Sequence, residues 1–171
     1  MTIRSIQRGD AAAMNVFARS LPDEETTFLK GDAMDDDGVP AGSLRLVAIG
    51  DDGAIEGYAS VHPGVGMSSH VGDVRLIVAP VARGRGVGVG LARRAMIESF
   101  SSLGLSKLSV EVVADEQGTI QMFRKLGFSP EALLRDHLCD PSGRMRDLVM
   151  LCHLASDGMA DFSILGSSAS V

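Results

Sequence analysis

The clearest pattern of apolar and polar positions in the chain covers residues 71–100. Apolar residues nearly alternate with others over 71–79, which predicts a strand, and Pro80 ends it because proline cannot donate to a sheet ladder. From Val87 onward the apolar positions fall three and four apart, which predicts an amphipathic helix. Four glycines lie at alternate positions between the strand and the body of this helix: Gly84, Gly86, Gly88 and Gly90.

The same two periodicities predict the elements on either side of this segment. Further strands are expected over 2–7, 44–49, 55–62, 108–113, 132–138 and 148–154. Further helices are expected over 11–21, 23–30 and 117–126. Asp10 and Asp115 are the expected caps of two of these helices, and Gly104 and Gly127 the expected helix ends.

The connections between these elements predict how the strands are arranged. Turn sequences at 50–53 and 140–143 indicate two hairpins of antiparallel strands. The strand over 71–78 is joined to the strand over 108–113 by a helical crossover, so these two strands must run parallel. The sheet is therefore expected to be mixed, with a parallel pair at its centre.

A strand followed by a glycine-rich turn and a helix start is suited to binding an anion. The first N–H groups of a helix have no partner within it, and the helix dipole places partial positive charge there. Glycine allows a close approach to this backbone, and Arg83 and Arg85 add two permanent cations. A flexible surface turn that carries basic residues is the alternative interpretation.

The spacing of the glycines and basic residues distinguishes between the known kinds of phosphate-binding motif. The dinucleotide fingerprint requires glycines at relative positions 0, +2 and +5, and no start in this turn supplies the third one. A nucleoside-triphosphate loop requires Gly-Lys followed by Ser or Thr, and no lysine lies between Lys30 and Lys107. The sequence Arg83-x-x-Gly86-x-Gly88 instead resembles the acyl-CoA diphosphate signature of the GCN5-related N-acetyltransferase (GNAT) family.

A second stretch, MFRKLGF over 122–128, is similar to another motif of the same family. The family usually has an asparagine before this helix and a tyrosine within it. Glu116 and Phe123 stand at those positions here, so Phe123 is better explained as a core residue. The resemblance covers about residues 2–154.

The resemblance implies the GNAT acyl-CoA N-acyltransferase fold, an α/β (mixed α+β) architecture. Its central sheet is mostly antiparallel, has about six or seven strands and is flanked by helices on both faces. One domain is expected over 1–155, followed by a tail over 156–171 that is flexible or packs on a neighbour. The parallel strand pair would bind acyl-CoA, with these cofactor-binding residues: Ile77, Val78, Ala79, Arg83, Gly84, Arg85, Gly86, Val87, Gly88, Val89, Gly90 and Phe123.

The chemistry of amine acylation requires a proton acceptor. An alkyl amine has a pKa of about 10.4 and arrives protonated at neutral pH. Asp73, on the central strand, is the leading candidate base, acting through a water molecule, with Glu116 and His70 as reserves. Asp73 is equally explained as a polar residue at the sheet surface. The resemblance further implies that the Val78 N–H polarises the thioester carbonyl.

The predicted function is therefore an N-acetyltransferase that moves an acetyl group from acetyl-CoA to a primary amine by direct attack in a ternary complex. The acceptor could be a small molecule, a protein lysine or an N-terminus. An inactive acyl-CoA-binding sensor and an oligomeric scaffold are the alternatives. Seven carboxylates between residues 23 and 37 form either a solvated loop or an electrostatic funnel for a cationic amine: Asp23, Glu24, Glu25, Asp32, Asp35, Asp36 and Asp37.

Length, composition and charge limit the number of domains and the classes of partner that the chain is expected to have. A length of 171 residues suits one domain, and a net charge of −6 argues against nucleic acid as the main partner. The four histidines show no metal-ligand spacing, no apolar run is long enough to cross a membrane, and the start is too polar for a signal peptide. Two cysteines outside any CxxC motif are expected to be reduced in a cytoplasm. The chain is expected to be a monomer or a homodimer.

Overall fold

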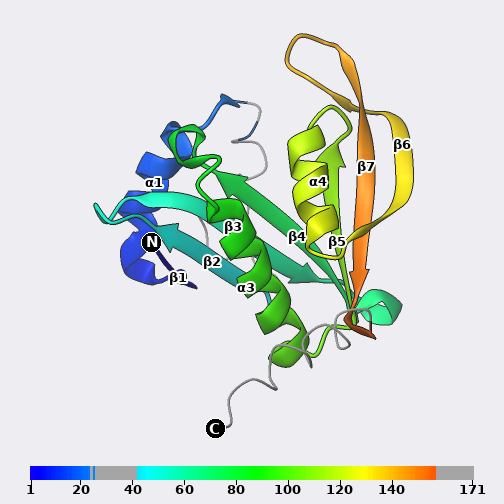
Figure 1. Cartoon of the computed structure of the whole chain (residues 1–171), viewed down its shortest axis with the longest axis horizontal. Helices are drawn as coiled ribbons and strands as arrows, with labels where there is room; N and C mark the ends of the chain where they lie inside the picture. Colours follow the sequence, from blue (N-terminus) through cyan, green and yellow to red (C-terminus); the bar gives the residue numbers. More distant parts are fainter. Residues whose placement is uncertain (24, 26–41, 157–171) are drawn as a thin grey trace, which may run out of the picture.

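A seven-stranded mixed sheet forms the centre of the computed structural model, which describes residues 1–23, 25 and 42–156. The strand order is β1-β2-β3-β4-β5-β7-β6, and every neighbouring pair is antiparallel except β4 and β5, which are parallel (Figure 1). The strands are β1 (Thr2–Ser5), β2 (Leu44–Ile49), β3 (Ile55–Pro63), β4 (Val71–Val78), β5 (Lys107–Val113), β6 (Ser129–Cys139) and β7 (Met145–Leu154). The mixed α/β fold class and the parallel central pair are confirmed.

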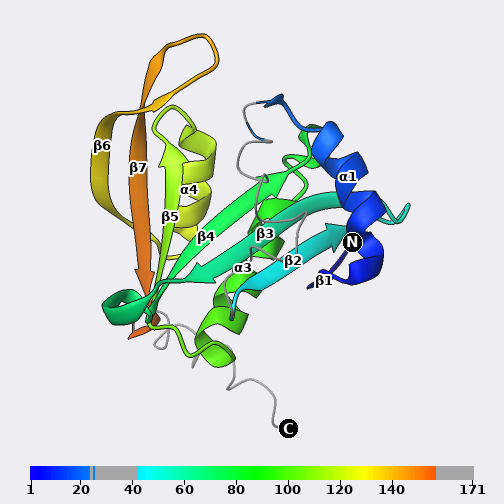
Figure 2. The same ribbon diagram turned by 180° about the vertical axis from the view of Figure 1, so that it is seen from behind.

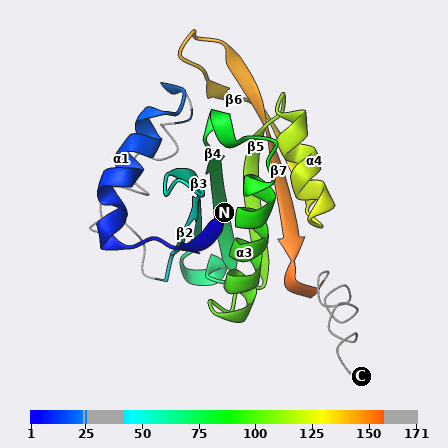
Figure 3. The same ribbon diagram turned by 60° about the vertical axis from the view of Figure 1, so that its left-hand side comes forward.

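Helices cover both faces of this sheet, as the family resemblance implies. The helix α1 (Ala11–Arg19) lies on one face and α3 (Val87–Ser101) on the other, which Figure 2 and Figure 3 show from two further sides. The helix α4 (Gln117–Lys125) lies on the same face as α3, where the Met122 sulfur comes close to Gly88. Three short 3-10 turns complete the described elements: η1 (Arg8–Asp10), η3 (Gly66–Ser68) and η4 (Pro80–Ala82).

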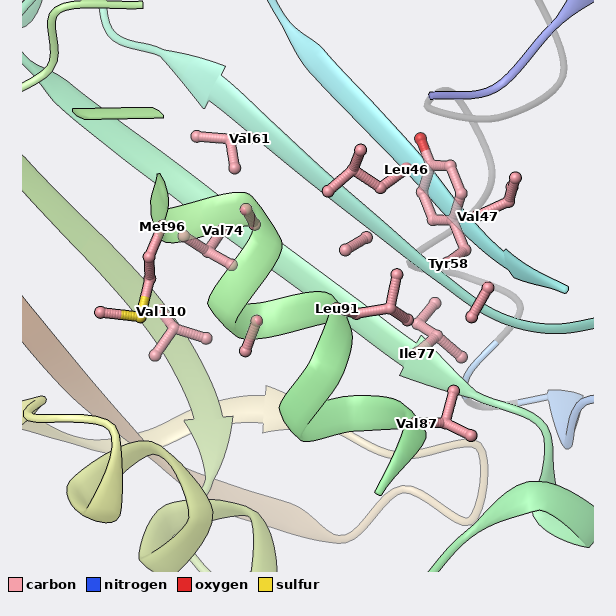
Figure 4. Packing of buried hydrophobic residues seen from close by; sticks show 14 of the residues in the cluster. Leu46, Val47, Tyr58, Val61, Val74, Ile77, Val87, Leu91, Met96 and Val110 are labelled. Carbon is pink, nitrogen blue, oxygen red and sulfur yellow. The ribbon is translucent and has the colours of Figure 1, made fainter. Parts of the chain in front are cut away.

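The core between α3 and the sheet depends on close packing. Leu91 and Val87 point from α3 towards the strands, and Leu91 is fully buried (Figure 4). A Cβ atom at Gly57 of β3 would lie 2.8 Å from Leu91 Cδ1 and 3.2 Å from the Ile77 carbonyl oxygen, so only glycine fits beneath the helix. Tyr58, the next residue of β3, is 1% exposed and belongs to the same buried cluster.

Two predicted turns and one predicted helix end are confirmed in detail. The hairpin turns close with hydrogen bonds of 3.0 Å from Gly53 N–H to Gly50 and 2.8 Å from Gly143 N–H to Asp140. At the end of α4, Phe128 N–H donates to Phe123 and Gly127 N–H donates to Arg124, both at 3.0 Å. With Gly127 at φ +91°, this is the Schellman arrangement, and it satisfies two carbonyls that the helix itself leaves open.

One of the two predicted aspartate caps is confirmed in position and the other is wrong. Asp10 occupies the cap position of α1 but makes no side-chain capping bond; it accepts hydrogen bonds from the Arg4 guanidinium and from Gln7 N–H. The hydrogen bonds from Arg4 are the main reason that the pKa of Asp10 lies below its ordinary value. Asp115 precedes the cap position of α4, which Glu116 occupies, and forms an ion pair with Arg146 at 3.0 Å instead.

Several boundaries also differ from those expected. The final hairpin is longer: β6 begins at Ser129 and β7 at Met145. The first strand ends at Ser5, because residues 8–10 form the turn η1. Most of the predicted helix over 23–30 and most of the acidic stretch lie outside the described residues, as does the tail beyond residue 156.

Replacing Gly127 tests whether its positive φ and its close contact with His153 both contribute to the free energy of unfolding. A Cβ atom there would lie 2.9 Å from His153 Cε1, so Gly127→Ala carries both backbone strain and a clash. We expect the free energy of unfolding in urea to fall by about 2–4 kcal/mol. Gly143→Ala is the matched control: its φ is +84° and a Cβ atom would meet nothing within 4 Å. It should cost only about 1–2 kcal/mol. Equal losses in the two variants would contradict the clash with His153.

Candidate functional site

The strands β4 and β5 separate halfway along their length. Their parallel pairing runs from Val71–Lys107 only to Val74–Val110, although each strand continues for three or more residues. Figure 1 shows β4 and β5 close together at one end and diverging towards the other. A cleft of about 1020 Å³ lies in the gap, lined by β4, β5, the turn after β4 and the start of α4.

Val78 presents its backbone to this cleft. Ala79 N–H donates to the Glu56 carbonyl at 2.9 Å, which makes Ala79 a hydrogen-bonded position of the β3–β4 ladder. Hydrogen-bonded and non-hydrogen-bonded pairs alternate along an antiparallel ladder, so Val78, opposite Gly57, points its N–H and C=O away from β3. The direction away from β3 is the gap between β4 and β5. The Val78 N–H therefore points towards this gap.

The turn between β4 and α3 is shaped by positive backbone angles. Gly84 and Gly86 have φ values of +74° and +85°, and a Cβ atom at either would meet nothing within 4 Å. These glycines are therefore needed for the backbone conformation and also leave the turn accessible. Gly86 occupies the cap position of α3, so the first N–H groups of a 15-residue helix face the accessible turn. This is the geometry of an anion site.

The two arginines of this turn are held by glutamates. Arg83 Nη2 lies 2.6 Å from both carboxylate oxygens of Glu25, and its Nε donates to the Val78 carbonyl at 3.1 Å. Arg85 Nη1 donates to Glu56 Oε1 at 2.8 Å. Both cations are at the predicted turn, but neither guanidinium projects freely into it.

Asp73 lies on the sheet face opposite α3, next to the point where β4 and β5 part. Its side chain is 43% exposed and accepts a hydrogen bond from Arg75 Nε at 3.3 Å. Across the two neighbouring strands it stands opposite His62 and Ser109. Asp73 therefore borders the cleft and is accessible to solvent, whereas the reserve candidate His70 precedes β4 and is not among the cleft-lining residues.

Three further residues belong to this region, and the sequence analysis named only Glu25 among them, within the acidic stretch. Glu111 of β5 lines the cleft beyond the last parallel pair, on the same sheet face as Asp73. Glu25 joins the cleft from the segment after α1. His62 bonds through Nδ1 to Ser43 Oγ at 3.0 Å and through Nε2 to Ser60 Oγ at 3.1 Å. Glu111 had a signal in the sequence as a polar position in an apolar strand, and Glu25 as a member of the acidic stretch, whereas His62 had none.

The two substituted motif positions lie on the α4 side of the cleft. Glu116 is exposed at the start of α4 and lines the cleft. Phe123 borders the cleft but is 1% exposed, and its ring packs edge-on against Phe128 with centroids 5.1 Å apart. The core explanation of Phe123 is thus supported by its burial.

Two other kinds of site are absent from the part of the chain that the structure describes. No group of three or more described His, Cys, Asp or Glu residues is arranged to hold a metal ion. No helix within residues 1–23 and 42–156 is long and apolar enough to cross a membrane.

Comparison with known proteins identifies one family. The model of the acetyltransferase (GNAT) family matches residues 10–128, which is more than half of the chain. Among curated proteins, the chain is 29% identical over 96 residues to spermidine N(1)-acetyltransferase of Escherichia coli K12, covering 51% of that protein. It is 36% identical over 93 residues to mycothiol acetyltransferase of Pseudarthrobacter chlorophenolicus, covering 28% of it. The chain thus spans about half or less of the length of these relatives.

Solved structures show the same fold at low sequence identity. A GNAT-family acetyltransferase of Streptococcus pneumoniae superposes with a TM-score of 0.74 at 20% identity, covering 90% of this chain and 98% of the other. A chimera of the Vibrio cholerae spermidine N-acetyltransferase SpeG and hSSAT gives 0.73 at 21% identity, covering 94% and 99%.

Proposed function

The chain belongs to the acetyltransferase (GNAT) family, and from this membership we propose that it transfers an acetyl group from acetyl-CoA to a primary amine. The observation that carries the proposal is the parting of β4 and β5 directly beside an accessible glycine turn at the start of α3. An elongated ligand with an anionic end and a neutral arm fits this combination. The cleft volume of about 1020 Å³ suits a ligand larger than a typical drug-sized molecule.

In this proposal the diphosphate of acetyl-CoA accepts hydrogen bonds from backbone N–H groups of the turn and the first turn of α3. Residues 83–90 contribute this backbone, and the open space at Gly84 and Gly86 admits the phosphate oxygens. The neutral arm lies between the parted strands along residues 77–79. The thioester carbonyl accepts a hydrogen bond from Val78 N–H, which stabilises the negative charge that develops on this oxygen.

The charges around the cleft favour a cationic acceptor. The basic residues among the cleft-lining residues, Arg75 and Arg83, are each paired with a carboxylate. Glu111 and Glu116 form no ion pair with another described residue, so this wall of the cleft has unbalanced negative charge. Together with the similarity to a spermidine acetyltransferase, this supports a small amine that carries further positive charge, ahead of a protein lysine or an N-terminus.

In the proposed reaction, Asp73 accepts a proton from the acceptor amine. The ammonium group of the acceptor gives one proton to the Asp73 carboxylate, directly or through a water molecule, and becomes nucleophilic. The amine nitrogen then attacks the thioester carbon, an amide bond forms, and the carbon–sulfur bond breaks. The nitrogen gives up its second proton to solvent as the amide forms, and the coenzyme A thiolate leaves and takes up one proton, so that the net reaction releases one proton. A thiol pKa of about 8.5 makes the thiolate a tolerable leaving group without a dedicated acid.

A catalytically inactive acyl-CoA sensor is the second candidate, and one observation favours it. Phe123 is 1% exposed and has no hydroxyl group, so it cannot protonate the leaving thiolate. Release of free thiol from acetyl-CoA in the presence of spermidine and other amines distinguishes the two candidates. Turnover supports the transferase, whereas tight binding of coenzyme A without thiol release supports the sensor.

Removal of the Asp73 carboxylate tests its role as the base. We expect Asp73→Ala and the isosteric Asp73→Asn to lower kcat about 10²-fold or more at low pH, where nearly all of the amine is protonated. The loss should shrink as pH rises, because free amine becomes available without a base. Affinity for acetyl-CoA, measured by calorimetry, should change little. A pH–rate profile that keeps the wild-type shape would mean that a residue other than Asp73 is the base.

Replacement of Gly86 tests where the diphosphate lies. A side chain at Gly86 would project into the open space of the turn and strain a backbone with φ +85°. We expect Gly86→Val to weaken coenzyme A binding in calorimetry by about 30-fold or more, because several charged hydrogen bonds are lost. Gly143→Val, at φ +84° in the β6–β7 turn, carries similar strain away from the cleft and should bind normally. Normal affinity of Gly86→Val would refute the placement.

A further inference from the structure

The Arg83 side chain runs back along the cleft and connects three separate parts of the chain. Its Nε–H donates to the Val78 carbonyl at the end of β4, at 3.1 Å. Its Nη2 group donates to both oxygens of Glu25, which lies 58 residues earlier in the sequence, at 2.6 Å each. One guanidinium therefore links the turn, the end of β4 and the segment that follows α1.

The peptide group between Val78 and Ala79 is held from both sides. Its C=O accepts the bond from Arg83, and its N–H donates to the Glu56 carbonyl at 2.9 Å. The Val78 carbonyl points into the gap where β5 has moved away, so no neighbouring strand pairs with it there. Arg83 supplies a donor in place of that missing strand. This contact adds to the β3–β4 ladder, which sets the direction of the Val78 N–H, in holding the end of β4.

Glu25 in turn fixes the guanidinium. The Arg83 side chain is 49% exposed, and a long exposed side chain has many rotamers unless a partner selects one. The planar guanidinium can meet the carbonyl through Nε and the carboxylate through Nη2 at the same time. A lysine ammonium at this position would keep the charge but could not span the two acceptors in the same way.

We propose that Glu25 is a positioning residue, which acts through Arg83 to orient the end of β4 for the thioester. This inference rests on the proposed function and deepens it, because the side-chain contacts of Glu25 are with Arg83. It also gives the Arg83 side chain a task other than neutralising the diphosphate, whose charge is met by the backbone of the turn. The segment after α1 thereby contributes to the reaction centre through one ion pair.

Variants that separate charge from geometry test the proposal in the full chain. Glu25→Gln should lower kcat by about tenfold while the Kd for coenzyme A changes less than about threefold, because one charged hydrogen bond near the reacting group is weakened. Arg83→Lys should lower kcat as much as Arg83→Met, since both lose the bond to Val78. Glu98→Gln is the matched control: it removes the Arg94–Glu98 ion pair on the exposed side of α3. It should leave kcat and Kd at wild-type values.

A double variant separates a positioning role from an independent one. If Glu25 acts only through Arg83, adding Glu25→Gln to Arg83→Met should change kcat by less than about twofold. Additive losses would overturn the proposal. So would tighter coenzyme A binding in Glu25→Gln, because that result would mean that Glu25 merely competes with phosphate for the arginine.

A readout that does not need turnover keeps this inference distinct from the proposed function. Amide hydrogen exchange at Ala79 should be about tenfold or more faster in Glu25→Gln and in Arg83→Met, and unchanged in Glu98→Gln. A wild-type chain that fails to bind coenzyme A or release thiol would refute the proposed function, while the exchange rates still test the contact. Unchanged exchange at Ala79 in both cleft variants would refute the positioning role.

Discussion

The parting of β4 and β5 after the Val74–Val110 pair is the constraint on which the rest of the site depends. Each strand keeps its other neighbour along nearly its whole length: β4 pairs with β3 as far as Val78, and β5 pairs with β7 as far as Val113. The molecule thus contains two well-paired half-sheets joined by a short parallel ladder. Because adjacent strands are twisted relative to each other, such a short junction allows the half-sheets to diverge into a cleft.

Separated strand edges leave backbone groups that require partners, since buried N–H and C=O groups are rarely left unpaired. At the end of β4 the chain supplies a partner for one group, because the Arg83 side chain meets the Val78 carbonyl. The N–H of the same residue points into the same gap. The site is therefore partly completed by a side chain of the turn, and an acyl thioester would complete it further. Binding of the thioester and the chemical step therefore both use the end of β4.

The parts of this structure that local sequence determines were predictable. The strand and the amphipathic helix over residues 71–100 follow from the periodicity of their apolar residues. The turn between them follows from its glycines, two of which adopt the positive φ values that glycine favours. The Schellman end at Gly127 follows from the Leu-Gly-Phe sequence in the same way. The parallel direction of β5 follows from the connection through α3, because a helical crossover returns the chain in the same direction.

The parts that depend on distant contacts were not predictable. The contact between Arg83 and Glu25 joins residues 58 positions apart, and no spacing rule in the sequence indicates it. Asp10 stands at the predicted cap position, but its carboxylate accepts two charged hydrogen bonds from Arg4 of β1 in place of one capping bond. The direction of the Val78 N–H depends on which pairs of the β3–β4 ladder are hydrogen-bonded, and this register exists only in the folded sheet.

A crystal structure of the chain with bound coenzyme A tests the central claim most directly. The diphosphate should accept hydrogen bonds from backbone N–H groups between residues 84 and 88, and the neutral arm should lie between β4 and β5 with its sulfur near Val78. Coenzyme A bound outside this gap, or a gap that closes so that β4 and β5 pair beyond Val74, would contradict the assignment of the cleft and the acetyl transfer proposed for it.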